Sequence, residues 1–353
     1  MSDTPENAAT TPVRCLRDFS LEELKALVVS LGEKPFRATQ IQDWLVGRLA
    51  ASYDEMKNLP RAFRERLAQM VPAFSLKTVA RLQDPEDGTV KWLSELSDGH
   101  TVETVLMRIP ERSTVCISTQ VGCPVQCVFC ASGRGGLVRN LSVAEIMDQV
   151  ILASRENGGR VDNIVVMGMG EPLLNLDALI PALRALAFGV RRVTISTSGI
   201  VPGILRLAKE GDPWNLALSL HAVDDEMRGR IIPAHHRYPL SEIFAAMKVY
   251  REKLGDFRHL TLEYALVAGQ NDSPGALEKL ARIAADLQAK VNFIPCNPND
   301  SRLTAPTQRR CQEAVAFLES RGVTATLRRS RGQGILAACG QLRQKRQQQQ
   351  SLS

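Results

Sequence analysis

The stretch VGCPVQCVFCASG (residues 121–133) places Cys123, Cys127 and Cys130 within eight residues of a chain that holds only eight cysteines. The strand-like run TVCIST comes just before it, and a helical pattern begins after it at Ser142. We therefore expect the three thiols on a loop at the carboxyl end of a β-strand. Parallel sheets build their active sites at that end of their strands.

The chain beyond residue 115 repeats this alternation of strand and helix. Helical patterns at 142–157, 241–254, 276–288 and 307–321 lie between strand-like runs rich in Val and Ile. This alternation predicts βαβ units and a parallel sheet. About six units fit an open barrel better than a closed eightfold one, so we expect an α/β fold with a partial (β/α)6-type barrel. The strand-like runs are TVCIST, NIVVMGMG, RVTISTSG, NLALSLHA, LTLEYALV, VNFIPCN and VTATLRR.

The segments before and after the barrel differ from it in pattern. The beginning of the chain is helical, and Ser20 with Glu23 forms a capping-box pattern there. Short alternating runs follow, which predict β-hairpins. The expected domains are a small helical domain (1–72), a hairpin segment leading into the barrel (73–114), the barrel core (115–340) and a polar, basic tail (341–353) that we expect to be disordered.

Composition limits the class of protein. No apolar run approaches the roughly 18 residues of a membrane helix, and the first dozen residues lack the basic start and apolar stretch of a secretory signal. We therefore expect a cytoplasmic protein with no membrane partner, in which clustered cysteines serve metal or redox chemistry. The net charge of +6 favours a polyanionic partner, RNA or DNA.

Three closely spaced thiols leave two hypotheses for the metal. Structural zinc takes four tetrahedral ligands, usually from two paired knuckles, and neither a second CxxC nor a His pair follows at a comparable spacing. A [4Fe-4S] cluster takes one thiolate per iron, so three cysteines leave one iron open. An open iron can bind a small molecule and pass an electron to it. The pattern favours the cluster.

Polar residues and their neighbours follow several of the later strand-like runs. Taken singly, such a residue is more often a turn cap or a buried, hydrogen-bonded core group than a ligand. Their shared position at successive strand ends indicates one site. These residues are Gly170, Glu171, Ser196, Ser219, Leu220, His221 and Asn297.

The spacing C-x3-C-x2-C, with Phe129 before the last cysteine, resembles the signature of radical S-adenosylmethionine (SAM) enzymes. Longer segments resemble the RlmN family of RNA adenine C2-methyltransferases and its C8-modifying relative, Cfr: FRATQIQDWL, VETV, RNLSVAEI, VVMGMGEPLLNLD, RRVTISTSG, LSLHA-x5-R and ACGQL. The match covers nearly the whole chain. It implies one [4Fe-4S] cluster on Cys123, Cys127 and Cys130. It also implies SAM on the open iron, held by Phe129 and the strand-end residues named above.

The resemblance also implies a reaction that uses two SAM molecules per turnover. One methylates Cys339, and the other is cleaved on the cluster to a radical that activates this methyl group for addition to C2 of adenine. Cys116 then releases the product through a transient disulfide with Cys339, and Glu103 accepts a proton from C2. The implied substrates are an adenine of the peptidyl-transferase region of 23S rRNA and, for many members, the adenine beside the tRNA anticodon. A flavodoxin or ferredoxin would supply electrons to a monomeric enzyme.

Two groups of basic residues are candidates for RNA contact. Phosphate binding by Lys and Arg is the sequence-independent part of nucleic-acid affinity. One group lies in the helical domain, which we therefore expect to be an RNA-binding accessory domain, and the other lies near Cys339. The residues are Lys34, Arg37 and Arg48 in the first group and Arg328, Arg329, Arg331, Arg343, Lys345 and Arg346 in the second.

Two segments depart from the family pattern. RGQGILAACGQL (331–342) lacks the acidic residues that are common upstream of the cysteine, and His235 and His236 stand where Asn and a basic residue are common. Neither departure touches the cysteines. Two alternatives stay open: C8 methylation of adenine in 23S rRNA with antibiotic resistance, and a zinc-bearing RNA-binding protein without catalysis.

Overall fold

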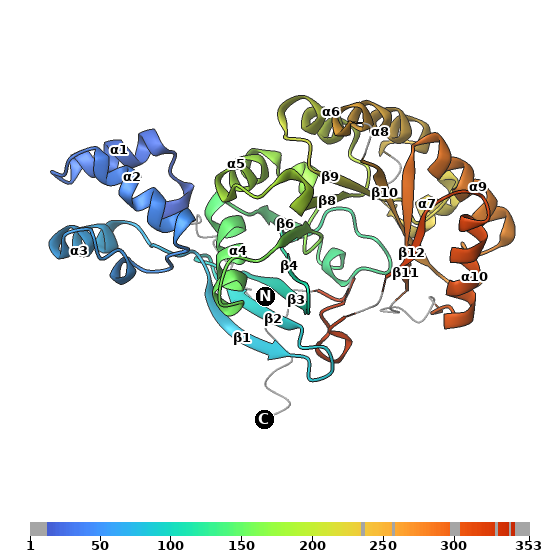
Figure 1. The fold of residues 1–353 in the computed structure, drawn as a ribbon, viewed down its shortest axis with the longest axis horizontal. Coiled ribbons are helices and arrows are strands. Elements are labelled where there is room, and N and C mark those ends of the chain that lie inside the picture. Colours follow the sequence, from blue (N-terminus) through green and yellow to red (C-terminus); the bar gives the residue numbers. More distant parts are fainter. Residues whose placement is uncertain are drawn as a thin grey trace, which may run out of the picture.

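Ten strands form one sheet in the order β1-β2-β3-β4-β7-β8-β9-β10-β11-β12. The structure is a computed structural model that describes residues 13–233, 237–255, 258–296, 304–328, 331–338 and 340–342. Neighbouring strands are parallel from β4 onward, and the described strands do not close back from β12 onto β1 (Figure 1). The strands are β1 (Lys77–Gln83), β2 (Val90–Glu95), β3 (Thr101–Ile109), β4 (Arg112–Cys116), β7 (Asn163–Val166), β8 (Val193–Thr197), β9 (Asn215–Ser219), β10 (Leu260–Leu266), β11 (Ala289–Pro295) and β12 (Ala325–Leu327).

This arrangement confirms the α/β class and the open barrel. All seven strand-like runs of the barrel contain a parallel strand, one more than a six-stranded barrel has, because the three-residue β12 extends the open edge. Every residue of β10 is buried. Continuous burial is expected of a parallel strand that is covered on both faces, and even the polar residues Thr261 and Glu263 are buried here.

Helices cover the outer, convex side of the parallel strands (Figure 1). The first of them, α4, begins where Ser142 and Glu145 form a capping box, with each side chain accepting the other's backbone N–H. Its buried face belongs to the same apolar core as the parallel strands. The helices are α4 (Val143–Glu156), α5 (Leu176–Leu186), α6 (Val201–Glu210), α7 (Asp225–Ile231), α8 (Leu240–Leu254), α9 (Pro274–Asp286) and α10 (Gln308–Glu319).

The hairpin segment is part of the barrel sheet. Strands β1 to β4 are antiparallel neighbours, and β3 pairs directly with the first barrel strand, with Val105 opposite Cys116. The expected hairpins are therefore present. They extend the sheet beyond the barrel, because β3 satisfies the edge of β4 that would otherwise be open.

The beginning of the described chain forms a separate helical unit, as expected. Helices α1 (Leu21–Ser30), α2 (Phe36–Gln42) and α3 (Arg61–Met70) surround an apolar core of their own. Ser20 and Glu23 make the predicted capping box at the start of α1. In Figure 1 this unit lies beside α4, at one end of the molecule.

A buried ion pair joins the helical unit to the barrel. The Arg17 guanidinium lies 2.7 Å from Asp148 on α4, and the two side chains are 1% and 0% exposed. Arg17 also donates to the carbonyl oxygens of Ala73 and Leu45. The second oxygen of Asp148 accepts from the backbone N–H and the hydroxyl of Ser75, at 2.7 Å each. These hydrogen bonds offset the cost of burying both charges.

We predict that Asp148→Asn lowers the free energy of unfolding by about 3 kcal/mol or more, because the variant leaves the Arg17 charge buried without its counter-charge. Urea denaturation measures the change. The control is Glu65→Gln, which breaks the exposed pair with Arg61 at 2.7 Å and should cost less than about 1 kcal/mol. Equal losses in the two variants would show that the buried pair does not hold the domains together.

Candidate active site

The cysteine loop is closed at its base by two short antiparallel strands, β5 (Gln120–Gly122) and β6 (Leu137–Asn140). The backbone N–H of Cys123 donates to the carbonyl of Gly136 at 2.9 Å. Gly122 has φ +77°, and a Cβ there would collide with the Gly136 carbonyl oxygen. The closure therefore requires glycine immediately before the first cysteine.

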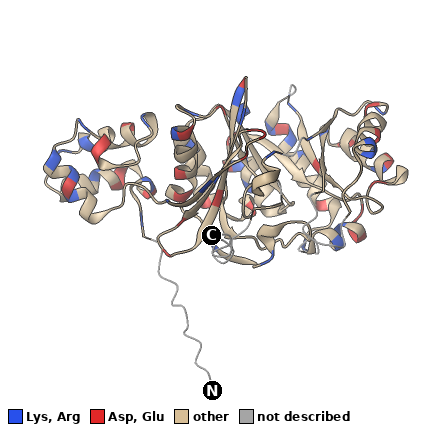
Figure 2. Cartoon of the chain, turned by 90° about the horizontal axis from the view of Figure 1, so that it is seen from below, with Lys and Arg blue, Asp and Glu red and all other residues tan. Residues whose placement is uncertain are grey.

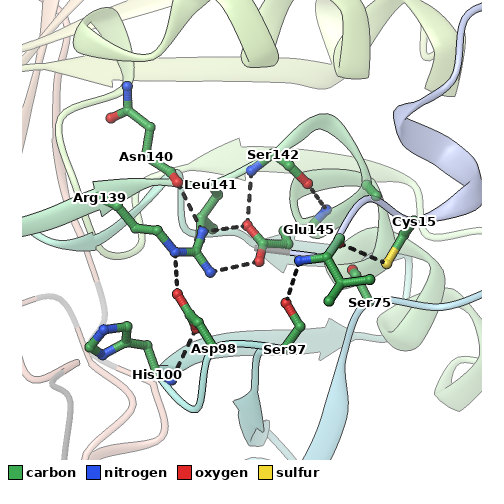
Figure 3. A network of polar contacts seen from close by, with 12 residues as sticks. Cys15, Ser75, Ser97, Asp98, His100, Arg139, Asn140, Leu141, Ser142 and Glu145 are labelled. Carbon is green, nitrogen blue, oxygen red and sulfur yellow. Dashed lines mark hydrogen bonds and ion pairs between the residues drawn. The ribbon is translucent and has the colours of Figure 1, made fainter. Parts of the chain in front are cut away.

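Arg139 on β6 anchors this base to the rest of the barrel (Figure 3). Its guanidinium donates to both oxygens of Glu145 at 2.8 Å and lies 2.5 Å from Asp98. Glu145 is in the first turn of α4, and Asp98 is in the turn between β2 and β3. Both carboxylates are 4% exposed. Bidentate, shielded pairs of this kind fix geometry well, so the loop base is held to a helix and to a hairpin at once.

The three thiols lie along one wall of a pocket, together with Phe129. Burial raises the pKa of Cys123 to about 12 and also raises the pKa of Cys127, which the neighbouring sulfurs of Cys130 and Cys123 raise further. These groups are therefore protonated at neutral pH unless a cation replaces the protons. Metal binding at this site would release protons.

Glu171, which follows β7, is buried and accepts four hydrogen bonds. One oxygen accepts from the Leu173 N–H at 3.1 Å and the Thr197 hydroxyl at 2.8 Å, and the other from the N–H and hydroxyl of Ser198 at 2.7 and 2.8 Å. Burial raises the pKa of Glu171, and these donors oppose the rise. A carboxylate has about four acceptor positions. The side chain therefore ties the end of β7 to the end of β8, and the backbone around it faces the pocket.

Three more predicted residues meet at the same rim. The hydroxyl oxygens of Ser196, on β8, and Ser219, on β9, are 3.2 Å apart. Gly170 lines the pocket with them. It has φ +105°, and a Cβ there would lie 2.6 Å from the Gln120 side chain. Gly170 thus lets the chain pass close to Gln120, whose amide oxygen accepts the Glu171 N–H at 2.8 Å.

His221 follows β9 and is buried against Phe129, with the two ring centroids 4.8 Å apart and the rings edge to face. Its Nδ1 accepts the backbone N–H of Ala265 at 2.9 Å. A backbone N–H can only donate, so Nδ1 carries no proton and Nε2 does. Burial, with a smaller contribution from the Arg228 charge, lowers the pKa of His221 to about 3. The residue is therefore a neutral hydrogen-bond donor in the pocket wall.

Sequence reasoning assigned no role to two charged groups of this site, one of which, Arg228, ends the quoted segment LSLHA-x5-R. Glu263 on β10 is buried and lines the pocket. Arg228 on α7 is buried behind the cysteine loop and donates to the carbonyl oxygens of Leu220 at 3.2 Å and Ser219 at 3.3 Å. Burial lowers the pKa of Arg228 to about 10, while Cys127, Asp225 and Glu171 oppose this. A carboxylate inside an otherwise apolar strand, LTLEYAL, was the available signal for Glu263.

The pocket has a cavity volume of about 150 Å³ and opens to solvent at its mouth. A second cavity adjoins it. Cys130, Met167, Gly168, Arg328 and Gly340 are among the residues that line both. We refer to them as the cluster cavity and the Cys116 cavity, because Cys116 lines only the second.

Cys116 and the chain around residue 339 meet at the Cys116 cavity. Ala338 and Gly340 both line it, and the Gly340 carbonyl accepts the Ala131 N–H of the cysteine loop at 2.7 Å. Residue 339 itself lies outside the described residues, as do Asn297, Arg329, His235, His236, and the three basic residues at 343, 345 and 346. Leu220 is fully buried, and its N–H donates to the Glu263 carbonyl at 3.0 Å.

Glu103 lies on β3 and is buried. Its carboxylate is 2.9 Å from the Lys91 ammonium, with both side chains 8% exposed. Glu103 lines neither cavity, but Val105 and Met107, which do line the Cys116 cavity, follow it at two-residue spacing on the same strand. Side chains two apart on a strand share a face, so Glu103 points to the side of the sheet on which that cavity lies.

Residues 15–72 match the family model of the ribosomal RNA large subunit methyltransferase N-terminal domain, and residues 117–281 match the radical SAM superfamily. A protein of Geobacillus thermodenitrificans described as a probable dual-specificity RNA methyltransferase RlmN is 44% identical, over 98% of this chain and 96% of its own. A protein of the same description from Symbiobacterium thermophilum is 45% identical, over 94% of this chain and 92% of its own. The chain belongs to the RlmN family. The crystal structure of a radical SAM methyltransferase from Sphaerobacter thermophilus has a TM-score of 0.88 at 44% identity, and covers 94% of this chain and 99% of that one.

The radical SAM family implies a [4Fe-4S] cluster and SAM, and the residues of the cluster cavity suit both. Within the described chain, no three His, Cys, Asp or Glu side chains stand close enough to hold one metal ion. A cluster makes a different demand, because each thiolate binds its own iron. The three thiols would supply these ligands, and the serine hydroxyls and the His221 Nε2–H would supply polar groups for SAM.

The basic residues expected to bind RNA in the helical unit have acidic neighbours. Arg48 pairs with Asp43 at 3.1 Å, and Arg37 lies 3.7 Å from Glu33. Figure 2 shows Lys and Arg interspersed with Asp and Glu over these helices. RNA binding by this RlmN-family domain therefore stays a proposal. None of the described helices is both long and apolar enough to cross a bilayer.

We predict that His221 lowers the free energy of unfolding as the pH falls from 7 to 3. The pKa of His221 is about 3 in the folded state against an ordinary 6.5, so between these values the unfolded chain holds one more proton and lower pH favours unfolding. The slope reaches about 1.4 kcal/mol per pH unit. Denaturation curves from pH 7 to 3 measure it.

The matched variant is His221→Asn. Asn tolerates the φ of +59° found here and offers an acceptor to Ala265 without titrating. The difference in stability between wild type and variant should shrink or reverse toward acid. Parallel curves over the whole range would contradict a buried neutral His221.

Proposed function

We propose that this chain methylates C2 of adenine in 23S rRNA, and of the adenine beside the anticodon in tRNA. The reaction would pass through S-methylated Cys339 and a transient disulfide between Cys339 and Cys116. RNA as the substrate and methyl transfer as the reaction are supported by the descriptions of the relatives. The choice of C2 is supported by the long segments that this sequence has in common with RlmN.

One observation carries the proposal: the cluster cavity adjoins the Cys116 cavity, beside the chain that flanks residue 339. Gly340 lines both cavities and Ala338 lines the second. When bound, the cluster and SAM supply a methyl group and a carbon radical. Adenine C2 lies between two ring nitrogens and is electron-poor, so it does not attack the SAM methyl group as a nucleophile, whereas a carbon radical can add to it.

The chain's own residues would then have three tasks. The thiols of the cysteine loop bind the cluster, and the hydroxyls of Ser196 and Ser219 with the His221 Nε2–H orient SAM. Glu103 accepts the C2 proton. Its carboxylate lies 2.9 Å from the Lys91 ammonium, on the strand that also lines the Cys116 cavity.

The direct test is anaerobic reconstitution followed by mass mapping of the modified base in rRNA and tRNA. A brown iron- and sulfide-containing protein that places the methyl group on C2 supports the proposal. A methyl group on C8 would instead indicate the Cfr-type reaction. A colourless zinc protein without SAM cleavage would end the enzymatic interpretation.

We predict that Cys116→Ala traps the protein covalently on RNA. Addition to the base can go ahead, but no thiol is present to attack the linking sulfur and release the product. Denaturing electrophoresis with labelled RNA detects the adduct. The control is Cys311→Ala, since Cys311 is buried on α10 and lines neither cavity. Repeated, adduct-free turnover by the Cys116 variant would refute its assigned role.

We predict that Cys127→Ala reduces 5′-deoxyadenosine formation from SAM to background, because the cluster loses one of three ligands. Iron and sulfide content should fall in parallel. The circular dichroism of the helical unit should persist, since its apolar core is separate from that of the barrel. Cys311→Ala again serves as the control. Full cluster content in the Cys127 variant would contradict the assigned ligand set.

A further inference from the structure

Arg328 lies at the boundary between the cluster cavity and the Cys116 cavity. It directly follows β12, and its backbone N–H donates to the Phe293 carbonyl at 2.8 Å, which continues the pairing with β11. Its side chain lines both cavities. Over the described ranges it is the one Lys or Arg side chain in the wall of the cluster cavity. The Arg328 guanidinium therefore faces any group that lies between the two cavities.

Glu263 on β10 and Met167, which follows β7, lie beside this guanidinium. Its Nη1 lies 3.7 Å from Glu263 and 3.6 Å from the Met167 sulfur. Glu263 in turn accepts from the Asn292 amide at 3.1 Å, and the Asn292 oxygen accepts from the Thr326 hydroxyl at 3.1 Å. The Arg328 side chain is 24% exposed and that of Glu263 is 6% exposed. An arginine has a planar fork of five N–H donors, which can serve several acceptors at once.

Adenine has an acceptor nitrogen on each side of C2, N1 and N3. A carbon radical next to sulfur is electron-rich and adds fastest to an electron-poor carbon. The addition forms one C–C σ bond, breaks one C–N π bond at C2, and leaves the unpaired electron on the ring, where the nitrogens beside C2 take up part of the added electron density. A hydrogen bond from a cation to N1 or N3 is therefore stronger in the transition state than before it, and so speeds the addition.

We propose that Arg328 contacts the target adenine and donates a hydrogen bond to the ring nitrogen beside C2. This inference rests on the proposed function. It assigns Arg328 a contact with the adenine base, whereas the sequence suggested a contact with phosphate. A contact at N1 would also select the substrate. Guanine carries a hydrogen on N1 and cannot accept there, and adenine N1 is accessible only in an unpaired base.

Arg331 provides the contrast within the same segment. It lines the Cys116 cavity but not the cluster cavity, and its guanidinium donates to the Arg108 carbonyl at 3.4 Å, away from Glu263. A phosphate contact at that position would change affinity without depending on any one atom of the base. Arg331→Gln is therefore the matched control for Arg328→Gln.

The experiment crosses protein variants with atomic changes in the RNA. Wild type, Arg328→Gln and Arg331→Gln each act on a ligated RNA in which the target adenine, located by the mass mapping above, is intact or replaced by 1-deaza- or 3-deaza-adenine. The readout is methylated base formed per 5′-deoxyadenosine released, which normalises for cluster content and SAM cleavage. Arg328→Lys, which keeps the charge but not the fork, replaces Arg328→Gln if that variant does not fold.

We expect Arg328→Gln to lower this ratio at least tenfold on adenine. With wild-type protein, one of the two deaza bases should lower the same ratio to a similar extent. With the Arg328→Gln variant, that deaza base should lower the ratio by less than about threefold more, because the contact is already lost. Arg331→Gln should show the full deaza effect.

Three outcomes overturn the inference. If both deaza effects persist in full in the Arg328 variant, the contact does not exist. If the variant chiefly raises the SAM concentration needed for 5′-deoxyadenosine formation, Arg328 is a SAM ligand. If wild type yields no C2-methylated adenine, the proposed function fails and the inference fails with it. If adenine is methylated at C2 but the effects of the Arg328 substitution and of the deaza bases are independent, the proposed function stands and only the inference about Arg328 fails.

Discussion

Parallel pairing of β4, β7, β8, β9 and β10 is the constraint on which the site depends. Each strand runs in the same direction as its neighbour, so their carboxyl ends meet at one rim. The cysteine loop follows the first of these strands, Glu171 the second, Ser196 closes the third and His221 follows the fourth. Hydrogen bonds then fix the rim laterally: Glu171 reaches the end of β8, and the Ser196 and Ser219 hydroxyls bridge β8 and β9. These hydrogen bonds between strand ends fix the relative positions of the side chains that line the pocket.

The sequence predicts what depends on local pattern. Each barrel strand has a Val- and Ile-rich run, and each predicted polar residue follows such a run, so topology alone brings Cys123, Gly170, Ser219 and their neighbours to one pocket. The joining of β3 to β4 could not be predicted, because strand pairing at a sheet edge leaves no mark in either strand. The hydrogen bonding of Glu171 could not be predicted either. Three of its four donors belong to Thr197 and Ser198, more than 25 residues further along the chain, and the fourth depends on the local turn at Leu173. Residues outside the described ranges, Cys339 and Asn297 among them, keep their sequence-based assignments as predictions.

Buried charge is the second organising feature of the pocket. A bound cluster and its thiolate ligands would add negative charge in a region that already holds Glu171 and Glu263. Arg228 lies behind the cysteine loop, beside Pro124, Val125 and Gln126, and its charge lowers the pKa of the Cys127 thiol against the effect of burial. Its donors also hold the carbonyl oxygens that end β9. One side chain thus both offsets the charge of the ligands and fixes the strand end from which His221 extends.

The first two turns of α4 connect the helical unit to the cysteine loop. The Ala144 N–H, which has no partner within the helix, donates to Asp18 of the helical unit at 2.8 Å. Glu145 binds Arg139 at the base of the loop, and Asp148 binds Arg17. Because all three residues lie on the first two turns of one helix, a rotation of the helical unit about α4 would have to break a buried ion pair or move the loop that carries the thiols. An RNA held by the helical unit would therefore be presented to the two cavities at a fixed distance and angle, which is the positional control that attack at a single ring carbon requires.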